Sequence, residues 1–179
     1  LCKDMGYTFR VSDNTLQIET YQKDYLANIP TPESGLYEFN YPGYNDGWDS
    51  DNTTLLTSDG FLRAETFVEG EKDPTLWKKL ETPLAAAQHT KIELRVRYRY
   101  EADSAIPMQM FFITDKDTGW SESKSVKLML KSTDSGGEWE TYVLDMTSCE
   151  KWADNITNLR FDPFNASGFM EIDYIRVTK

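Results

Sequence analysis

The sequence predicts an all-β protein, an antiparallel β-sandwich, and two observations carry this prediction. Short segments that alternate between apolar and polar residues follow one another from position 35 to the C-terminus, separated by clusters of Gly, Asp, Asn, Ser and Pro. The chain also has no internal repeat of about 20–50 residues, which argues against solenoids and propellers. Two packed sheets of jelly-roll type are therefore the expected architecture.

The alternation marks eight expected strands, each with one face toward a core. It is clearest over 91–100, where Ile92 and Leu94 face one way and Arg95 and Arg97 the other. Residues 82–90 favour helix, since they contain an alanine run, but their length and Pro83 allow at most one or two turns. The expected strands cover 35–41, 60–67, 91–100, 108–115, 125–131, 138–146, 156–163 and 169–177.

The chain divides into a short appendage and a main domain. Two alternating segments flank the turn-forming residues Ser12 to Thr15, so a β-hairpin is expected within 1–29, as the remnant of a preceding domain. Residues 30–34 contain two prolines and read as a linker, and the main domain is expected over 35–179. The first residues lack the features of a signal peptide, so we expect the chain to come from a longer polypeptide.

Charge and composition exclude several classes of partner. The formal net charge is −11, which disfavours nucleic acid and anionic membranes and favours a neutral partner. No stretch approaches the roughly 18 apolar residues of a membrane span, so membrane insertion is not expected. A single histidine, His89, rules out a multi-histidine zinc site, and Cys2 and Cys149 are expected to be unpaired thiols.

The C-terminal third carries features that resemble a known family of modules. A tryptophan opens a strand at Trp139, and a second, Trp152, precedes the next strand. The runs Leu159 to Pro163 and Ile172 to Arg176 follow, and upstream the matching features are YEFNYPGYNDGW, Asp73-Pro74 and Gln109 to Thr114. Over 35–179 the chain resembles the jelly-roll, galactose-binding-like carbohydrate-binding modules of families 22 and 4. Residues 1–20 resemble the tail of a copper amine oxidase-like N-terminal domain of Gram-positive surface proteins.

The resemblance implies a function, a location and partners. Such modules bind glycans without catalysis and accompany bacterial glycoside hydrolases and other cell-surface enzymes. The chain is therefore expected to recognise a neutral plant or microbial polysaccharide and to target a larger extracellular enzyme or surface protein. Its expected location is secreted or at the cell surface of a bacterium, Gram-positive in type, with other domains of the same polypeptide as partners. A structural or protein-adhesion sandwich is the alternative, because one fold hosts many functions.

The resemblance also implies a structural calcium ion where the first and last strands meet. Calcium takes oxygen ligands, and the candidates are Glu38, Asn40 and Asp173. Glu38 and Asn40 share a strand face, and broken alternation between Ile172 and Ile175 predicts a β-bulge that redirects Asp173. Asn40 stands where the family shows an acidic residue, and an ordinary solvated carboxylate is the alternative role for Asp173.

Aromatic and planar polar side chains are the candidates for sugar recognition. Indole rings stack on the C–H faces of sugars, while Arg, Gln and Asn hydrogen-bond hydroxyl groups. Trp139 and Trp152 lie among strand signals and are expected in the core. The alternating arginines of 91–100 form a stripe that Arg160 and Gln109 would join if their strands are neighbours; cross-strand pairing with acidic residues is the alternative. The candidate residues are Trp120, Trp77, Trp48, Arg97, Arg99, Gln109 and Arg160.

The strongest catalytic candidate is Glu171-Ile172-Asp173, which resembles the ExDxxE strand of sandwich β-glucanases. Arg176 stands at the position of the last carboxylate, so no acid is left to protonate a leaving group. No GxSxG, HExxH or phosphate-binding glycine motif is present in the sequence. We therefore interpret Glu171 and Asp173 as structural, and a glycoside hydrolase is the less favoured function.

Overall fold

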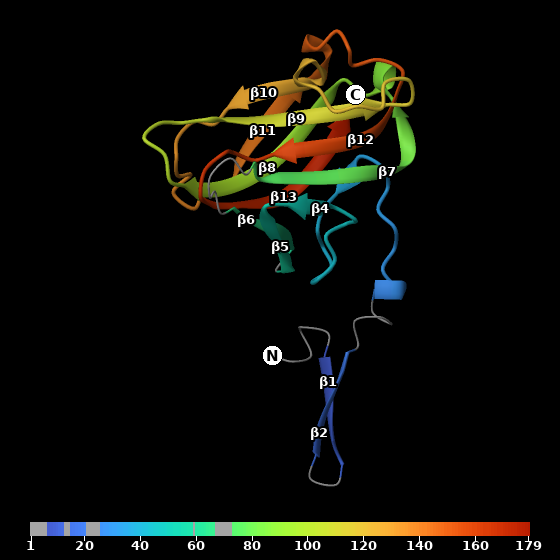
Figure 1. Cartoon of the computed structure of the whole chain (residues 1–179), viewed down its shortest axis with the longest axis vertical. Coiled ribbons are helices and arrows are strands. Elements are labelled where there is room, and N and C mark those ends of the chain that lie inside the picture. The colour runs from blue at the N-terminus through green and yellow to red at the C-terminus, as the bar shows by residue number, and fades with distance from the viewer. Residues whose placement is uncertain (1–6, 13–14, 21–25, 59, 67–72) are drawn as a thin grey trace.

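The computed structural model describes residues 7–12, 15–20, 26–58, 60–66 and 73–179. Two antiparallel sheets pack face to face as a β-sandwich, with β9, β12 and β7 running across the front of the view in Figure 1. The all-β sandwich expected from the alternating pattern is confirmed. Among the described residues, no helix has the length and apolar content needed to cross a bilayer.

The first sheet has five strands in the order β10-β9-β12-β7-β4. Their bounds are Ser125–Met129 (β10), Pro107–Thr114 (β9), Asn155–Asp162 (β12), Thr75–Ala85 (β7) and Asp49–Asp51 (β4). The second sheet has the order β11-β8-β13-β6-β5, with β3 paired to the end of β13. Their bounds are Glu140–Asp145 (β11), Lys91–Tyr100 (β8), Gly168–Thr178 (β13), Phe61–Thr66 (β6), Thr53–Ser58 (β5) and Leu36–Tyr37 (β3).

The core lies between the sheets and is filled by the inward residues of each alternating strand. Ile92, Leu94 and Val96 of β8 are fully buried, and Phe112 and Phe161 face them from the other sheet. Trp152 belongs to this core, as expected. It packs edge-on against Phe112, with ring centroids 4.8 Å apart, and its Nε1 donates to the carbonyl of His89 at 2.7 Å. Burial of these rings and branched chains is the main stabilising term of the sandwich.

The expected N-terminal hairpin is confirmed. Strand β1 (Tyr7–Ser12) pairs antiparallel with β2 (Thr15–Thr20), from Tyr7 opposite Thr20 to Ser12 opposite Thr15. The chain meets the sandwich at Ser34, whose Oγ accepts a hydrogen bond from the backbone N–H of Thr82 at 2.8 Å. The division into 1–29, 30–34 and 35–179 stays a prediction. Cys149 is a free thiol, and Cys2 lies outside the described residues.

Strand β7 was not expected, because its sequence contains a proline and an alanine run. It pairs with β12 at Lys79 opposite Asn158 and again at Leu84 opposite Ile156, with a bulge between the two. Pro83 lies in this bulge, where its missing N–H costs no ladder hydrogen bond. The expected helical stretch starts later than predicted and is a single 3₁₀ turn, η1 (Ala86–Gln88).

The first expected strand, 35–41, is shorter than predicted and ends after Tyr37. The buried carboxylate of Asp46 accepts hydrogen bonds from the backbone N–H groups of Glu38 and Phe39, at 3.0 and 2.8 Å. Phe39 has a φ of +51°, a left-handed conformation that does not continue a strand. A side-chain acceptor thus replaces the sheet ladder at this point.

Candidate functional site

The outer face of the five-stranded sheet brings together three of the residues expected to bind sugar. Trp77 of β7 lies opposite Arg160 of β12, and Arg160 lies opposite Phe111 of β9. Gln109, two residues before Phe111, lies opposite Asp162. Because side chains two residues apart point to the same side of a strand, these residues share one surface. We call this surface the Arg160 face.

Arg160 is the centre of the Arg160 face. Its Nε donates to Asp162 Oδ1 at 2.8 Å and its Nη2 to Asp162 Oδ2 at 2.7 Å, a bidentate pair. The same Nη2 donates to Asp73 Oδ2 at 2.8 Å. The guanidinium carbon lies 4.8 Å from the centre of the Phe111 ring, within cation–π range. Bidentate contacts and stacking together hold the guanidinium plane in one orientation.

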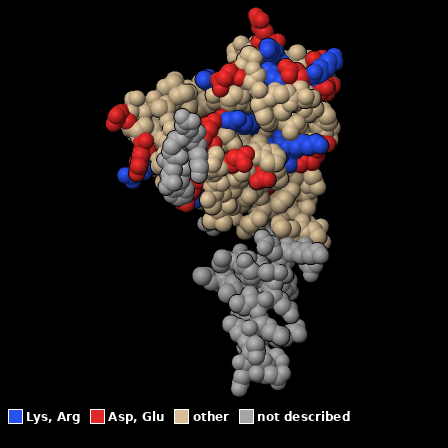
Figure 2. Space-filling model, in the orientation of Figure 1, with Lys and Arg blue, Asp and Glu red and all other residues tan. Residues whose placement is uncertain are grey.

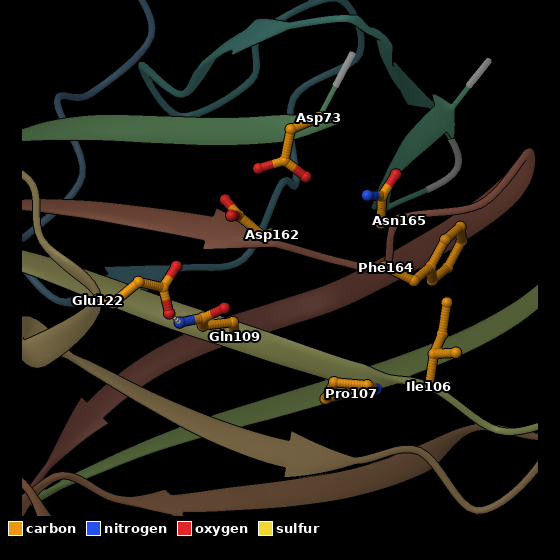
Figure 3. Close-up of a pocket in the computed structure, with 8 residues that line it drawn as sticks. All are labelled: Asp73, Ile106, Pro107, Gln109, Glu122, Asp162, Phe164 and Asn165. Atoms are coloured by element: carbon orange, nitrogen blue, oxygen red, sulfur yellow. Dashed lines mark hydrogen bonds between the residues drawn. The ribbon is translucent and has the colours of Figure 1, made fainter. Parts of the chain in front are cut away.

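A cleft of about 300 Å³ opens beside Arg160 on the same sheet. Figure 3 shows Asp73, Asp162, Glu122 and Gln109 around one part of the cleft and Phe164 with Ile106 and Pro107 around another. Polar groups thus lie beside apolar walls, the arrangement that small-molecule and sugar sites need. The lining residues are Asp73, Ile106, Pro107, Gln109, Glu122, Asp162, Phe164 and Asn165.

Gln109 is fixed in the cleft by two hydrogen bonds. Its Nε2 donates to Glu122 Oε2 at 3.0 Å and to Ser125 Oγ at 2.7 Å. The Glu122 carboxylate also lies 3.2 Å from Lys127 Nζ. The hydrogen bond from Gln109, together with Lys127, lowers the pKa of Glu122, so this carboxylate is ionised at neutral pH.

Asp162 has an unusual electrostatic environment. Burial raises its pKa to about 6, although the hydrogen bonds and the charge of Arg160 act in the opposite direction. The nearby carboxylates of Asp73 and Glu122 add to the increase, because a second and third negative charge disfavour ionisation. Asp162 therefore changes charge near pH 6.

Two of the expected aromatic platforms are exposed. Trp77 is 36% exposed beside Arg160, and Trp120 is 41% exposed in the segment between β9 and β10. Trp48 is a correction to the prediction: it is only 3% exposed and packs edge-on against Tyr37, with ring centroids 5.5 Å apart. Its neighbouring loop residues suggested exposure, but the indole packs into the hydrophobic core beside Tyr37.

Arg97 and Arg99 are also corrections, because they do not join Arg160 and Gln109. Their strand, β8, belongs to the six-stranded sheet, so the two groups lie on opposite outer faces of the sandwich. Arg97 pairs with Glu171 of the adjacent strand, and Arg99 Nε lies 3.6 Å from Asp134. The cross-strand pairing weighed as the alternative is the arrangement observed for Arg97.

Trp139, expected in the core, lies instead on the outer face of the six-stranded sheet. The guanidinium carbons of Arg97 and Arg95 lie 4.6 and 5.3 Å from the centre of its ring. Phe61 packs against its edge, with centroids 6.0 Å apart. Arginine side chains thus cover the faces of aromatic rings on this sheet, while on the opposite sheet Trp77 is left partly exposed.

The three candidate calcium ligands do not come together. Glu38 Oε1 accepts a hydrogen bond from Arg176 Nη2 at 2.7 Å, and the amide of Asn40 donates to the same carboxylate at 3.4 Å. Asp173 does lie at a bulge of β13, as predicted, but its carboxylate pairs with Arg95 at 2.5 Å. Arginines therefore occupy both carboxylates, and the residues do not fit a calcium ion. Among the described residues, no three His, Cys, Asp or Glu side chains are grouped to hold a metal.

Glu171 is a structural residue, and its removal is expected to lower stability. Its carboxylate accepts from Arg63 Nη1 at 2.7 Å and pairs through its other oxygen with Arg97. A Glu171→Gln substitution leaves two guanidinium groups without their shared anion, so we expect a loss of about 2 kcal/mol in the free energy of unfolding. Urea denaturation would measure it. Glu65→Gln is the control, because that carboxylate is more exposed and should lose about 0.5 kcal/mol or less. Equal losses would contradict this assignment.

Four residues that lie on the Arg160 face or line the cleft beside it were missed as site residues. Asp73, Phe111, Glu122 and Asp162 carry contacts to Arg160 or Gln109, yet none was named as a candidate. One signal was present: Arg160 and Asp162 alternate on one strand face, as Gln109 and Phe111 do. Asp73 and Glu122 lie outside the strands, so no local pattern could place them here.

The fold defines the class of protein to which this chain is similar. No protein-family model matches the sequence, and no curated protein matches it either. Solved structures do match its fold, and carbohydrate-binding modules of family 29 are among them, whereas the sequence resemblance is to families 22 and 4. The family 29 module itself has a TM-score of 0.52 at 12% identity, covering 79% of this chain and 85% of that chain.

Two single-residue variants of a family 29 module match equally well. One, in complex with mannohexaose, has a TM-score of 0.52 at 12% identity and covers 79% of this chain and 88% of that chain. The other, in complex with cellulohexaose, has a TM-score of 0.51 at 12% identity and covers 80% of this chain and 91% of that chain. At this identity the match establishes a shared jelly-roll fold.

Proposed function

We propose that this chain is a non-catalytic carbohydrate-binding module that binds a neutral polysaccharide on the Arg160 face. The observation that carries the proposal is the exposed indole of Trp77 directly across from the fixed guanidinium of Arg160. The module targets a larger extracellular or cell-surface protein to its glycan, and other domains of the same polypeptide are its partners. Its location is secreted or at the surface of a bacterial cell.

The chemistry of the face supports a sugar ligand. An exposed indole provides an apolar plane for the C–H groups of a pyranose ring. The guanidinium of Arg160 provides donors, while the carboxylates of Asp162 and Asp73 and the amide oxygen of Gln109 provide acceptors, so hydroxyl groups can both accept and donate hydrogen bonds. The contacts within the protein hold these groups in place before any ligand arrives, which reduces the entropic cost of binding.

Charge supports a neutral ligand. The carboxylates of Asp73, Asp162 and Glu122 line the cleft, so an acidic sugar would meet like charges. Figure 2 shows acidic and basic side chains intermingled on the viewed side of the sandwich, without a broad basic patch for a polyanion. Two of the similar family 29 structures are complexes of single-residue variants with the neutral sugars mannohexaose and cellulohexaose.

The size of the face supports a chain rather than a single sugar. Five strands about 4.8 Å apart make a surface roughly 19 Å wide, enough for several sugar units. An exposed surface of this kind exchanges water hydrogen bonds for sugar ones, so we expect affinities of about −4 to −8 kcal/mol, in the millimolar to micromolar range.

The positions of the acidic residues support binding without catalysis. Glu171 and Asp173, the catalytic candidates of the sequence, lie in β13 of the opposite sheet and pair with arginines. In the cleft, Asp162 and Asp73 share Arg160 and serve to orient it. These contacts favour structural roles for the carboxylates over roles as acid and nucleophile.

Binding of the whole chain to mannohexaose, cellohexaose and polygalacturonate, measured by calorimetry, tests the proposal. We expect binding to a neutral hexasaccharide and none to the acidic polymer. Trp77→Ala should weaken binding of the hexasaccharide about tenfold, because the apolar contact between the indole and a sugar ring is lost. Trp139→Ala is the matched control, since its ring lies on the other sheet. A panel without any binding, or equal effects of the two substitutions, would reject the Arg160 face and favour a protein-adhesion role.

A further inference from the structure

The segment from residue 115 to 121 carries an exposed tryptophan on a firmly held backbone. Trp120 is 41% exposed, and Ser121 caps the 3₁₀ turn η2 (Glu122–Lys124), accepting from the N–H of Ser123. Two of the N–H groups at the start of the segment, those of Lys116 and Asp117, donate to Thr114 Oγ1 at 3.3 and 3.0 Å. We call residues 115–121 the Trp120 loop.

Lys124 holds the middle of the Trp120 loop from within the protein. The residue is only 1% exposed, and its ammonium group has two acceptors on Asp117. The distances are 3.0 Å to the carbonyl oxygen and 2.7 Å to Oδ1. A buried ammonium needs such partners, because its own desolvation is costly. Lys124 and Asp117 therefore fix each other's position.

Three contacts to strand β12 and to the residue before it hold the start of the loop. Asn155 Nδ2 donates to Asp115 Oδ2 at 2.8 Å, and the backbone N–H of Asp115 donates to the carbonyl of Asn155 at 2.9 Å. Lys116 Nζ donates to Asp154 Oδ1 at 2.8 Å. The loop is thus attached both to β12 and to Lys124.

The Trp120 loop borders the Arg160 face. It leads directly into Glu122, whose carboxylate accepts a hydrogen bond from Gln109 on that face and lines the cleft. Trp120 is two residues from Glu122, so the backbone that carries its exposed ring lies at the edge of the cleft. An exposed indole on an ordered loop can contact a ligand with little loss of conformational entropy.

We propose that the Trp120 loop is a preordered aromatic arm of the saccharide site, on which Trp120 contacts a sugar unit beyond those on the sheet and Lys124 is the positioning residue. This inference rests on the proposed function. The ligand class is a neutral oligosaccharide long enough to reach from Trp77 to the loop. Lys124 has no contact with sugar and acts through the backbone of Asp117.

The test compares Trp120→Ala, Lys124→Met and the double variant for mannohexaose and cellohexaose binding by calorimetry. For whichever hexasaccharide binds, we expect each single substitution to lower the affinity about tenfold. The double variant should lose no more than Trp120→Ala alone, because a loop without its tryptophan has nothing left to position. Lys151→Met is the control: its ammonium also bonds near the loop, to Ser123 Oγ, but is exposed. It should leave affinity unchanged.

Melting curves show whether each variant is folded. If Lys124→Met unfolds, Asp117→Ala replaces it, because this variant keeps the carbonyl acceptor of Lys124. If Trp77→Ala weakens binding but Trp120→Ala leaves it unchanged, the inference that Trp120 contacts the sugar is overturned and the proposed function stays intact. A hundredfold loss in the double variant would overturn the positioning role, because the two residues would then act independently. If Trp77→Ala also has no effect, the proposed function itself fails.

Discussion

An Arg160→Met variant is expected to bind neutral hexasaccharide about a hundredfold more weakly than the unmodified protein, the largest loss for any single residue of the face. Arg160 donates three hydrogen bonds, to Asp162 and to Asp73, and stacks on Phe111. Methionine keeps the apolar contact with the ring but removes the donors. Without the cation between them, the carboxylates of Asp162 and Asp73 repel each other. The donors and the acceptors that contact the sugar then both lose their geometry.

Calorimetric titration of the variant with mannohexaose or cellohexaose measures this loss. The affinity of Arg160→Lys should fall between those of the unmodified protein and Arg160→Met, because lysine keeps the charge but cannot make the planar bidentate contact. Arg97→Met is the matched control, since Arg97 lies on the opposite face and pairs with Glu171. If Arg160→Met binds as tightly as the unmodified protein, the ligand contacts another surface.

Affinity should also depend on pH through Asp162, whose pKa is raised to about 6. The ionised carboxylate holds Arg160 by two hydrogen bonds, and protonation weakens this pair. If only the ionised form binds, affinity falls tenfold for each pH unit below the pKa, about a hundredfold between neutral pH and pH 4. An Asp162→Asn variant should bind weakly at every pH and show no such titration. A flat profile in the unmodified protein would contradict the role of Asp162.

Protonation of Asp162 has opposite effects on binding and on folding: it weakens binding but favours the folded state. The two effects can therefore be measured separately. Because the folded-state pKa of Asp162 is raised from 3.8, proton uptake favours the folded state. Its contribution to stability is therefore fully present below pH 3.8 and is lost as the pH rises through about 6. Unfolding of the unliganded protein, compared with Asp162→Asn at pH 4 and pH 7, isolates this contribution. Weaker binding at low pH then cannot be ascribed to Asp162 destabilising the fold.

The strands that sequence analysis located best are those whose two faces differ most in polarity. Residues 91–100 were placed as a strand to the residue, because buried and polar side chains alternate through the whole segment. Strand β7 was missed for the converse reason. Its buried Lys78 interrupts the apolar face, and its proline is accommodated by a bulge that depends on the partner strand. Burial of Lys78 is possible because its ammonium pairs with Glu81.

The sandwich, the N-terminal hairpin and the solvent-facing positions of Gln109 and Arg160 were determined by the sequence itself, because alternation and turn chemistry act between residues near in the chain. Tertiary structure alone decided which of these residues meet. Strand order placed Arg97 on one sheet and Arg160 on the other. Packing buried Trp48 against Tyr37 and placed Trp139 against Arg97 on the outer face of the six-stranded sheet. Pairing between distant strands depends on how all inward side chains fill one core together, and no local segment contains that information.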